Sequence, residues 1–211
     1  MSDLLVRRIE NGQFAQNCWL LADPDAGEAV IVDPGEEWER ILAEAGEYKV
    51  TGIWLTHAHV DHVLGVGGVR EATGAPIYLH PADRMLYDRA PQQGLMFGVH
   101  AGPMPQPDHE LAPGDEMTVG RHRFTVRHAP GHSPGHVVFV GDGVVVAGDV
   151  LFQGSVGRTD LPGGDTETLM RSIREELLTL PDETVVLSGH GPETTIGRER
   201  ASNPFLNHRL P

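Results

Sequence analysis

The stretch Thr56-His57-Ala58-His59-Val60-Asp61-His62 follows directly on Gly52-Ile53-Trp54-Leu55, an apolar run with the composition of a buried β-strand. Three histidines and one aspartate, all able to bind metal, therefore stand within six residues at a strand end. The first two histidines are two residues apart in an extended segment, so their side chains project to the same side. The adjacent aspartate and third histidine point in different directions, which suits a second ion. A solvated polar loop or a lone structural zinc site is the alternative, but four such groups favour an open hydrolytic zinc or iron centre.

Three later positions share one pattern, in which a strand-like run leads to a glycine and then to a metal-binding residue type. They are Gly131-His132, Gly148-Asp149 and Gly189-His190. Glycine lets the chain turn sharply, and the active sites of layered α/β proteins gather at strand ends. Each pair alone is a weak signal, but together with the histidine cluster the three predict one shared site.

The composition excludes several classes of protein. Sixteen Lys and Arg oppose 30 Asp and Glu, so the formal net charge is −14. Such a surface repels phosphate backbones and anionic membranes, and we therefore expect no nucleic-acid partner and no membrane association. A single cysteine, Cys18, excludes an internal disulfide and a Cys-rich zinc site, and we expect it to be an ordinary buried strand residue.

The 211 residues are enough for one large domain with a core that needs no disulfides. The N-terminal residues lack the order of a signal peptide, and no apolar run is long enough to span a membrane. These features predict a cytoplasmic protein.

The pattern of apolar residues predicts an α/β fold. Ten short runs, bounded by Gly, Pro, Asp or Asn, are expected to be strands: Leu4–Ile9, Cys18–Leu21, Ala29–Val32, Ile53–Leu55, Ile77–Leu79, Glu116–Val119, Arg123–Val126, Val137–Val140, Val144–Ala147 and Val185–Leu187. Four segments are expected to be helices: Glu36–Gly46, Val63–Thr73, Pro81–Arg89 and Thr166–Leu180, the last with Asp165 as its N-cap. Strands followed by a helix occur once in each half. This order predicts a four-layer αβ/βα sandwich in a single domain over residues 1–211.

One segment, Ala90–His109, has no clear periodicity and is rich in Pro and Gly. A loop this long in a compact domain is usually functional or disordered, and its apolar residues argue against plain disorder. It is expected to be either a loop at the substrate site or a structural wrap. If it borders the site, His100 could approach a substrate.

The motif His57-x-His59-x-Asp61-His62, with His132, Asp149 and His190, resembles the metal-binding motifs of the metallo-β-lactamase superfamily. The resemblance covers nearly the whole chain and implies the same αβ/βα sandwich. It also implies two divalent metal ions (zinc, iron or manganese). By the resemblance, one ion would be held by His57, His59 and His132, the other by Asp61, His62 and His190, and Asp149 would bridge the two.

Two further residues have supporting roles by this resemblance. Asp33, in Ile31-Val32-Asp33-Pro34-Gly35, is similar to the superfamily's early aspartate and would orient a ligand. It is also suited to an Asx-turn before Pro-Gly, and the two roles are compatible. His136 is expected to support the site or the fold, because the ligand set is full without it.

Two stretches narrow the resemblance to the small bacterial glyoxalase II-like group, the hydroxyacylglutathione hydrolases. They are residues 149–160 and residues 188–197. An aspartate at 149 is the bridging pattern of binuclear hydrolases, whereas the best-known β-lactamase subclass has cysteine there, so a β-lactamase of that type is disfavoured. Arg158 stands where glyoxalase II enzymes have a glutathione-contacting lysine, and it would either grip a substrate carboxylate or pair with a local acid such as Asp160. Only 21 residues follow His190, so we expect no separate C-terminal glutathione-binding helical domain.

The resemblance implies hydrolysis of a small-molecule thioester, with S-D-lactoylglutathione giving D-lactate and glutathione, by a hydroxide that bridges the metals. Asp61 would orient the nucleophile or accept its proton. Three alternatives stay open: a glutathione persulfide dioxygenase with one iron, a lactonase or esterase on the same dimetal site, and a non-catalytic metal- or partner-binding module. Either a monomer or a homodimer is expected.

Overall fold

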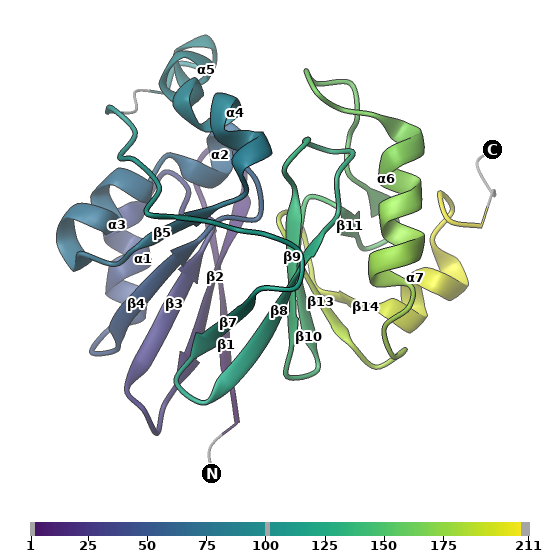
Figure 1. Ribbon diagram of the computed structural model, residues 1–211, viewed down its shortest axis with the longest axis horizontal. Helices are drawn as coiled ribbons and strands as arrows, with labels where there is room; N and C mark the ends of the chain where they lie inside the picture. The colour runs from purple at the N-terminus through teal and green to yellow at the C-terminus, as the bar shows by residue number, and fades with distance from the viewer. Residues whose placement is uncertain (1–2, 100–101, 208–211) are drawn as a thin grey trace.

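Two six-stranded β-sheets lie face to face in the middle of the molecule, and helices cover the outer face of each (Figure 1). The computed structural model describes residues 3–99 and 102–207. The first sheet consists, in spatial order, of β1 (Leu5–Asn11), β2 (Gln16–Asp23), β3 (Glu28–Val32), β4 (Lys49–Trp54), β5 (Ile77–Leu79) and β6 (His109–Glu110). The second consists of β14 (Thr194–Thr195), β13 (Val185–Ser188), β10 (Val144–Gly148), β9 (Val137–Gly141), β8 (His122–His128) and β7 (Glu116–Val119). A small hairpin pairs β11 (Leu151–Phe152) with β12 (Ser155–Val156).

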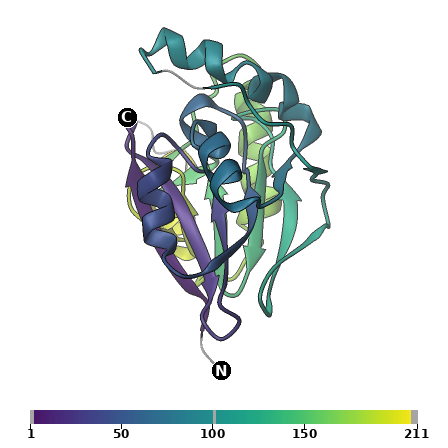
Figure 2. The ribbon, with the colours of Figure 1, turned by 90° about the vertical axis from the view of Figure 1, so that its left-hand side faces the viewer.

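The helices divide between the two sheets. With the first sheet lie α1 (Trp38–Ala45), α2 (Val60–Val63), α3 (Val66–Thr73), the 3₁₀ turn η1 (Pro81–Asp83), α4 (Arg84–Asp88) and α5 (Ala90–Met96). With the second lie α6 (Thr166–Ser172), the π-helical turn η2 (Ile173–Leu177) and α7 (Ile196–Ser202). Figure 2, which faces the helices of the first sheet, shows the blue helices in front of its strands. The predicted αβ/βα sandwich is confirmed.

Strand β2 shows why four layers form. All eight of its residues are buried, and successive side chains enter different cores. Cys18 and Leu20 pack between the first sheet and its helices, whereas Trp19 and Leu21 pack between the two sheets. Because strand side chains alternate between faces, a strand that is apolar on both faces needs a layer on each side. The prediction that Cys18 is a buried strand residue is confirmed.

Each of the ten predicted strands and four predicted helical segments is present, with ends shifted by a few residues. The predicted N-cap is confirmed, since Asp165 Oδ1 accepts a hydrogen bond of 2.7 Å from Thr168 N. The sequence missed the short strands β6, β11, β12 and β14 and the helices α2 and α7, because each is too short to show a clear period.

The prediction that Ala90–His109 lacks regular structure is wrong at both ends. Residues 90–96 form α5 and residue 109 begins β6, whereas residues 100–101, including His100, lie outside the described part. Pro91 sits in the first turn of α5, where its fixed φ suits a helix and its missing N–H costs nothing. Gly94 allows close packing, since a Cβ there would lie 2.9 Å from Val99 O and 3.6 Å from Val60 Cγ2.

The topology brings the ends of several strands to one edge of the sandwich. β3 runs parallel to β4, and β10 runs parallel to β13. The carboxyl ends within each pair therefore lie side by side, and the loops that follow them meet between the sheets. No helix within residues 3–99 and 102–207 is long and apolar enough to cross a membrane.

Candidate metal centre

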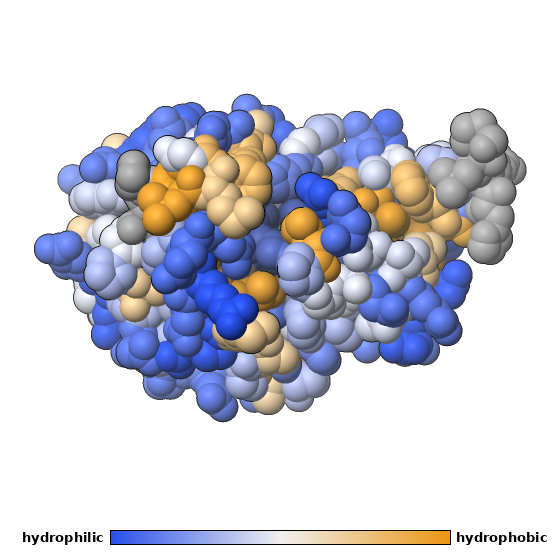
Figure 3. Space-filling model, turned by 90° about the horizontal axis from the view of Figure 1, so that it is seen from above, coloured by the Kyte–Doolittle hydropathy of each residue, from blue (hydrophilic) through white to orange (hydrophobic). Residues whose placement is uncertain are grey.

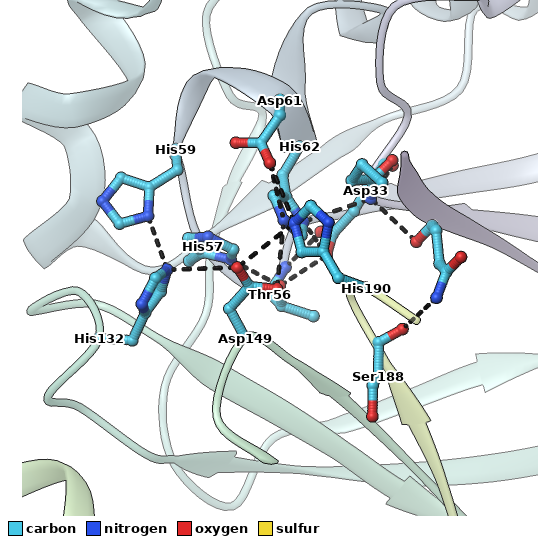
Figure 4. Close-up of polar contacts among 12 residues, drawn as sticks. Asp33, Thr56, His57, His59, Asp61, His62, His132, Asp149, Ser188 and His190 are labelled. Atoms are coloured by element: carbon cyan, nitrogen blue, oxygen red, sulfur yellow. Dashed lines mark hydrogen bonds and ion pairs between the residues drawn. The ribbon is translucent and has the colours of Figure 1, made fainter. Parts of the chain in front are cut away.

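Seven side chains from four strand-end segments gather at this edge (Figure 4). They are the ones that the sequence predicted as ligands: His57, His59, Asp61, His62, His132, Asp149 and His190. They form two sets able to hold an ion, which we call the first donor group (His57, His59, His132) and the second donor group (Asp61, His62, His190). The ligand-competent atoms within each group lie within 4.8 Å of one another.

The first donor group is buried and joins the two halves of the molecule. His59 Nδ1 lies 2.8 Å from His132 Nε2, and the His57 and His132 rings are 4.8 Å apart. His132 Nδ1 donates to the carbonyl oxygen of Arg158 at 2.8 Å, which leaves its Nε2 with the lone pair. Two nitrogens facing each other at 2.8 Å require a proton or a cation between them.

The second donor group is more open. His190 Nε2 lies 3.1 Å from Asp61 Oδ2, and His62 Nε2 lies 3.7 Å from the same oxygen. The His190 and Asp61 side chains are 29% and 16% exposed, whereas that of His62 is fully buried. A ligand from solution would therefore approach on the side of Asp61 and His190.

Asp149 lies between the groups, and its carboxylate oxygens face nitrogens of both. Its Oδ1 is 3.4 Å from His62 Nε2, and its Oδ2 is 3.5 Å from His132 Nε2 and 3.6 Å from His190 Nε2. A Cβ on residue 189 would lie 2.2 Å from Asp149 Oδ1. The glycine before His190 therefore lets that strand end approach the carboxylate.

Unsatisfied polar atoms show that the residues fit a metal centre. His57 Nε2, His62 Nε2 and Asp149 Oδ1 are buried and have no hydrogen-bond partner within the described ranges. Such orphaned atoms are rare in folded proteins because leaving them unpaired costs free energy. Three in one cluster, all of metal-binding type, indicate that cations complete the site.

The electrostatics divide the histidines into two kinds. Burial and the neighbouring His62 hold the pKa of His57 well below its usual value, and burial together with His132 lowers the pKa of His59 to about 3. Both rings are therefore neutral, as a metal ligand must be. Burial also disfavours charge on His62, but Asp149 and Asp61 outweigh it and raise the pKa of that ring. Burial alone would raise the pKa of Asp149, but the neighbouring His62 outweighs this effect and lowers it.

Asp33 and Thr56 orient the rings of His62 and His57 through hydrogen bonds. Asp33 Oδ2 accepts from His62 Nδ1 at 3.0 Å and from Thr56 Oγ1 at 2.6 Å, while Oδ1 accepts from Thr56 N at 2.7 Å. Because the Thr56 hydroxyl donates to Asp33, its oxygen accepts from His57 Nδ1 at 3.0 Å. Asp33 has a left-handed φ of 53°, a conformation that aspartate tolerates better than most residues. The sequence pointed to Asp33, but the role of Thr56 was missed although it begins the motif.

His136 packs against the first donor group but is not part of it. Its ring stacks on that of His57 with centroids 4.7 Å apart, and its Nε2 accepts from the backbone N–H of Asp149 at 3.1 Å. His136 therefore contacts both a donor ring and the main chain of the shared aspartate.

Gln16 and Asn17 at the start of β2 hold the neighbouring loops, and no sequence pattern indicated either residue. Gln16 Nε2 contacts Asp33 O at 3.1 Å and His62 Nδ1 at 3.3 Å. Asn17 Nδ2 donates to the carbonyl oxygens of Ser188 and Gly191, on either side of His190.

Arg158 pairs with Asp160, through hydrogen bonds of 2.7 Å from Nε and NH2 to the two carboxylate oxygens. Its side chain is 62% exposed. Of the two expectations for this residue, pairing with Asp160 is the one seen here. Its carbonyl oxygen, which accepts from His132, is a contribution to the site that no sequence pattern indicates.

Apolar side chains lie on the α4–α5 side of the site. Met85, Leu95, Met96 and Phe97 are exposed, and α5 packs on α2, which carries Asp61 and His62. The Phe97 ring makes an edge contact with Phe14 at 5.3 Å. In Figure 3, which looks onto this end of the molecule, orange side chains gather on that side next to polar ones.

The chain belongs to the metallo-beta-lactamase superfamily, whose family model matches residues 11–190. It is 41% identical to the hydroxyacylglutathione hydrolase GloC of Haemophilus influenzae, over 93% of this chain and 95% of that protein. Members of this superfamily are metallo-hydrolases, and the two donor groups suit two metal ions.

Three crystal structures share the fold. BLEG-1 B3 metallo-beta-lactamase has a TM-score of 0.89 and 40% identity, over 96% of this chain and 99% of that one. TTHA1623 in a di-iron-bound form has a TM-score of 0.86 and 42% identity, over 95% and 100%. ETHE1 from Myxococcus xanthus has a TM-score of 0.80 and 26% identity, over 98% and 92%.

Proposed function

We propose that this protein is a dimetal hydrolase that cleaves a thioester, with S-D-lactoylglutathione as the substrate to test first. The observation that carries the proposal is the position of Asp149, whose carboxylate oxygens face nitrogens of both donor groups. The 41% identity to a hydroxyacylglutathione hydrolase supports the choice of thioester. We include in the proposal a single domain over residues 1–211 and a cytoplasmic location.

In this proposal the first donor group would hold one divalent ion and the second the other, with Asp149 as the carboxylate that could serve both. Ions bound there would lower the pKa of a water molecule toward about 7 and polarise the carbonyl group of the substrate. Asp61, partly exposed and 3.1 Å from His190, would orient the attacking water or accept its proton. A thiol of pKa about 8–9 leaves as thiolate, so the site needs no strong general acid.

Thiol release and oxygen uptake together test the reaction. The protein loaded with Zn²⁺, Fe²⁺ or Mn²⁺ is expected to release thiol from S-D-lactoylglutathione without consuming oxygen. Lack of thiol release with every metal, while a lactone or a β-lactam is opened, would replace the thioesterase by another hydrolase on the same site. Binding of metal with no turnover of any activated ester would leave a non-catalytic module.

A glutathione persulfide dioxygenase is the second candidate. The segment Gly157-Arg158-Thr159-Asp160 favours it, because the dioxygenases that this chain resembles share that segment. They use one iron held by two histidines and an aspartate, whereas this chain presents a second complete donor group. Oxygen uptake with glutathione persulfide and one iron per chain would favour the dioxygenase.

Arg158 allows a test of glutathione recognition. Replacing it by alanine is expected to raise KM for the glutathione thioester several-fold with little change in kcat, because a distant carboxylate contact contributes to binding rather than to bond cleavage. Arg158→Lys keeps the charge but not the paired geometry, so its KM is expected to lie between those of the wild type and Arg158→Ala. The carbonyl oxygen that accepts from His132 is retained in both variants. An unchanged KM in Arg158→Ala would show that this guanidinium serves only its pair with Asp160.

A further inference from the structure

Asp83 is a fully buried carboxylate to which the proposed reaction assigns no role. It ends η1, just after β5 of the first sheet. Its Oδ2 accepts from Ala58 N at 3.0 Å and from Ser133 Oγ at 2.7 Å, and its Oδ1 accepts from Gly135 N at 2.6 Å. Three donors therefore converge on one side chain.

These donors belong to the two loops that carry the first donor group. Ala58 stands between His57 and His59, in the loop that follows β4 of the first sheet. Ser133 comes directly after His132, in the loop that follows β8 of the second sheet. Asp83 thus links the two halves of the molecule next to the point where His59 and His132 meet.

The contact with the second loop is tight. A Cβ on residue 135 would lie 2.6 Å from Asp83 N and 2.8 Å from Asp83 Oδ1, so only glycine fits. Ala129 N and His136 O, on either side of this loop, are joined by a hydrogen bond of 2.8 Å that closes its base. The His132 loop is therefore seated against η1 and has little freedom to shift alone.

We propose that Asp83 is a positioning residue that holds His57, His59 and His132 at the separation required to bind one metal ion. The inference rests on the metal centre of the proposed function but not on the identity of the substrate. A carboxylate suits the role because it accepts from all three donors. An amide of the same shape would turn an N–H₂ group toward at least one of them.

Zn²⁺ affinity of Asp83→Asn, measured by competition with a chromophoric chelator, tests the proposal. The affinity for one of the two ions is expected to fall about 10- to 100-fold, as for other groups that orient metal ligands, while the other ion binds as before. In the Co²⁺-loaded variant, the visible absorption of one ion is expected to change, because it responds to ligand geometry. Ser133→Ala removes one donor and leaves the carboxylate, so a smaller loss of affinity at the same ion is expected. If Asp83→Asn does not fold, the result for Ser133→Ala decides the test.

Asp23→Asn is the matched control. Asp23 is also a buried carboxylate that accepts backbone N–H groups, those of Asp25, Ala26 and Arg121. It lies at the far end of β2, about 23 Å along the strand from Gln16. The Asp23→Asn variant should leave the affinities for both Zn²⁺ ions unchanged. Equal affinities and spectra in wild type, Asp83→Asn and Ser133→Ala would overturn the inference, as would equal loss of both ions. A wild-type chain that binds no Zn²⁺ would overturn the metal centre itself.

Discussion

An Asp149→Asn variant will lose thioester hydrolysis by about 10³-fold or more and will retain no more than one metal ion per chain. The carboxylate is the group shared by the two donor groups, with its oxygens 3.4 Å from His62 Nε2 and 3.5 Å from His132 Nε2. An amide offers one oxygen and a nitrogen that does not bind metal, so it cannot serve both sides. Without two ions, the acidity of the water and the polarisation of the carbonyl are both lost. Metal analysis and thiol release measure the two effects.

The fold of this variant should persist, because asparagine has the same size and keeps the backbone N–H that donates to His136. Asp160→Asn is the control: its carboxylate is exposed and paired with Arg158, and such pairs contribute little. It should keep both ions and a rate within a few-fold of wild type. Near-normal turnover by Asp149→Asn with two ions bound would exclude a shared carboxylate.

The sequence predicted the donor groups well because their signals are local. Four of the seven residues stand within one motif, and the others each follow a glycine. The fold brings these segments together through parallel pairing of β3 with β4 and of β10 with β13, which was not predicted from the sequence. The layers were predictable because strands followed by a helix occur once in each half of the sequence.

The residues that support the donors could not be predicted in the same way. The side chains of Asp83 and Gln16 bind mainly to main-chain atoms of their partners. Every residue type has these atoms, so the identity of the partner does not reveal the contact. Asp83 is linked to Ser133, fifty positions along the chain, and only the packing of η1 against the second sheet's loop brings them together. Helix α5 was missed because Pro91 and Gly94 suggest a loop, whereas the structure uses one as a helix start and the other for a close approach to Val99 and Val60.

Metal removal will lower the midpoint of thermal unfolding by roughly 15 to 30 °C. An ion present at about 1,000 times its Kd stabilises the folded state by about 4 kcal/mol, and two such ions contribute twice that. In a chain of this size, 1 kcal/mol shifts Tm by about 2–4 °C. The cause is the group of buried atoms without hydrogen bonds, His57 Nε2, His62 Nε2 and Asp149 Oδ1, which cations satisfy in the folded state only. Scanning calorimetry of chelator-treated protein, before and after addition of Zn²⁺, measures the shift.

Two comparisons attribute this stabilisation to the donor groups rather than to nonspecific binding by an acidic chain of net charge −14. Mg²⁺ at the same concentration should have little effect, because it prefers oxygen ligands in octahedral geometry and five of the seven donors are imidazoles. Asp149→Asn should show about half of the Zn²⁺ shift or less, since it lacks the ligand that both ions share. Equal shifts with Zn²⁺ and Mg²⁺, or an undiminished shift in Asp149→Asn, would mean that the ions bind elsewhere on the acidic surface and that the orphaned atoms are satisfied in another way.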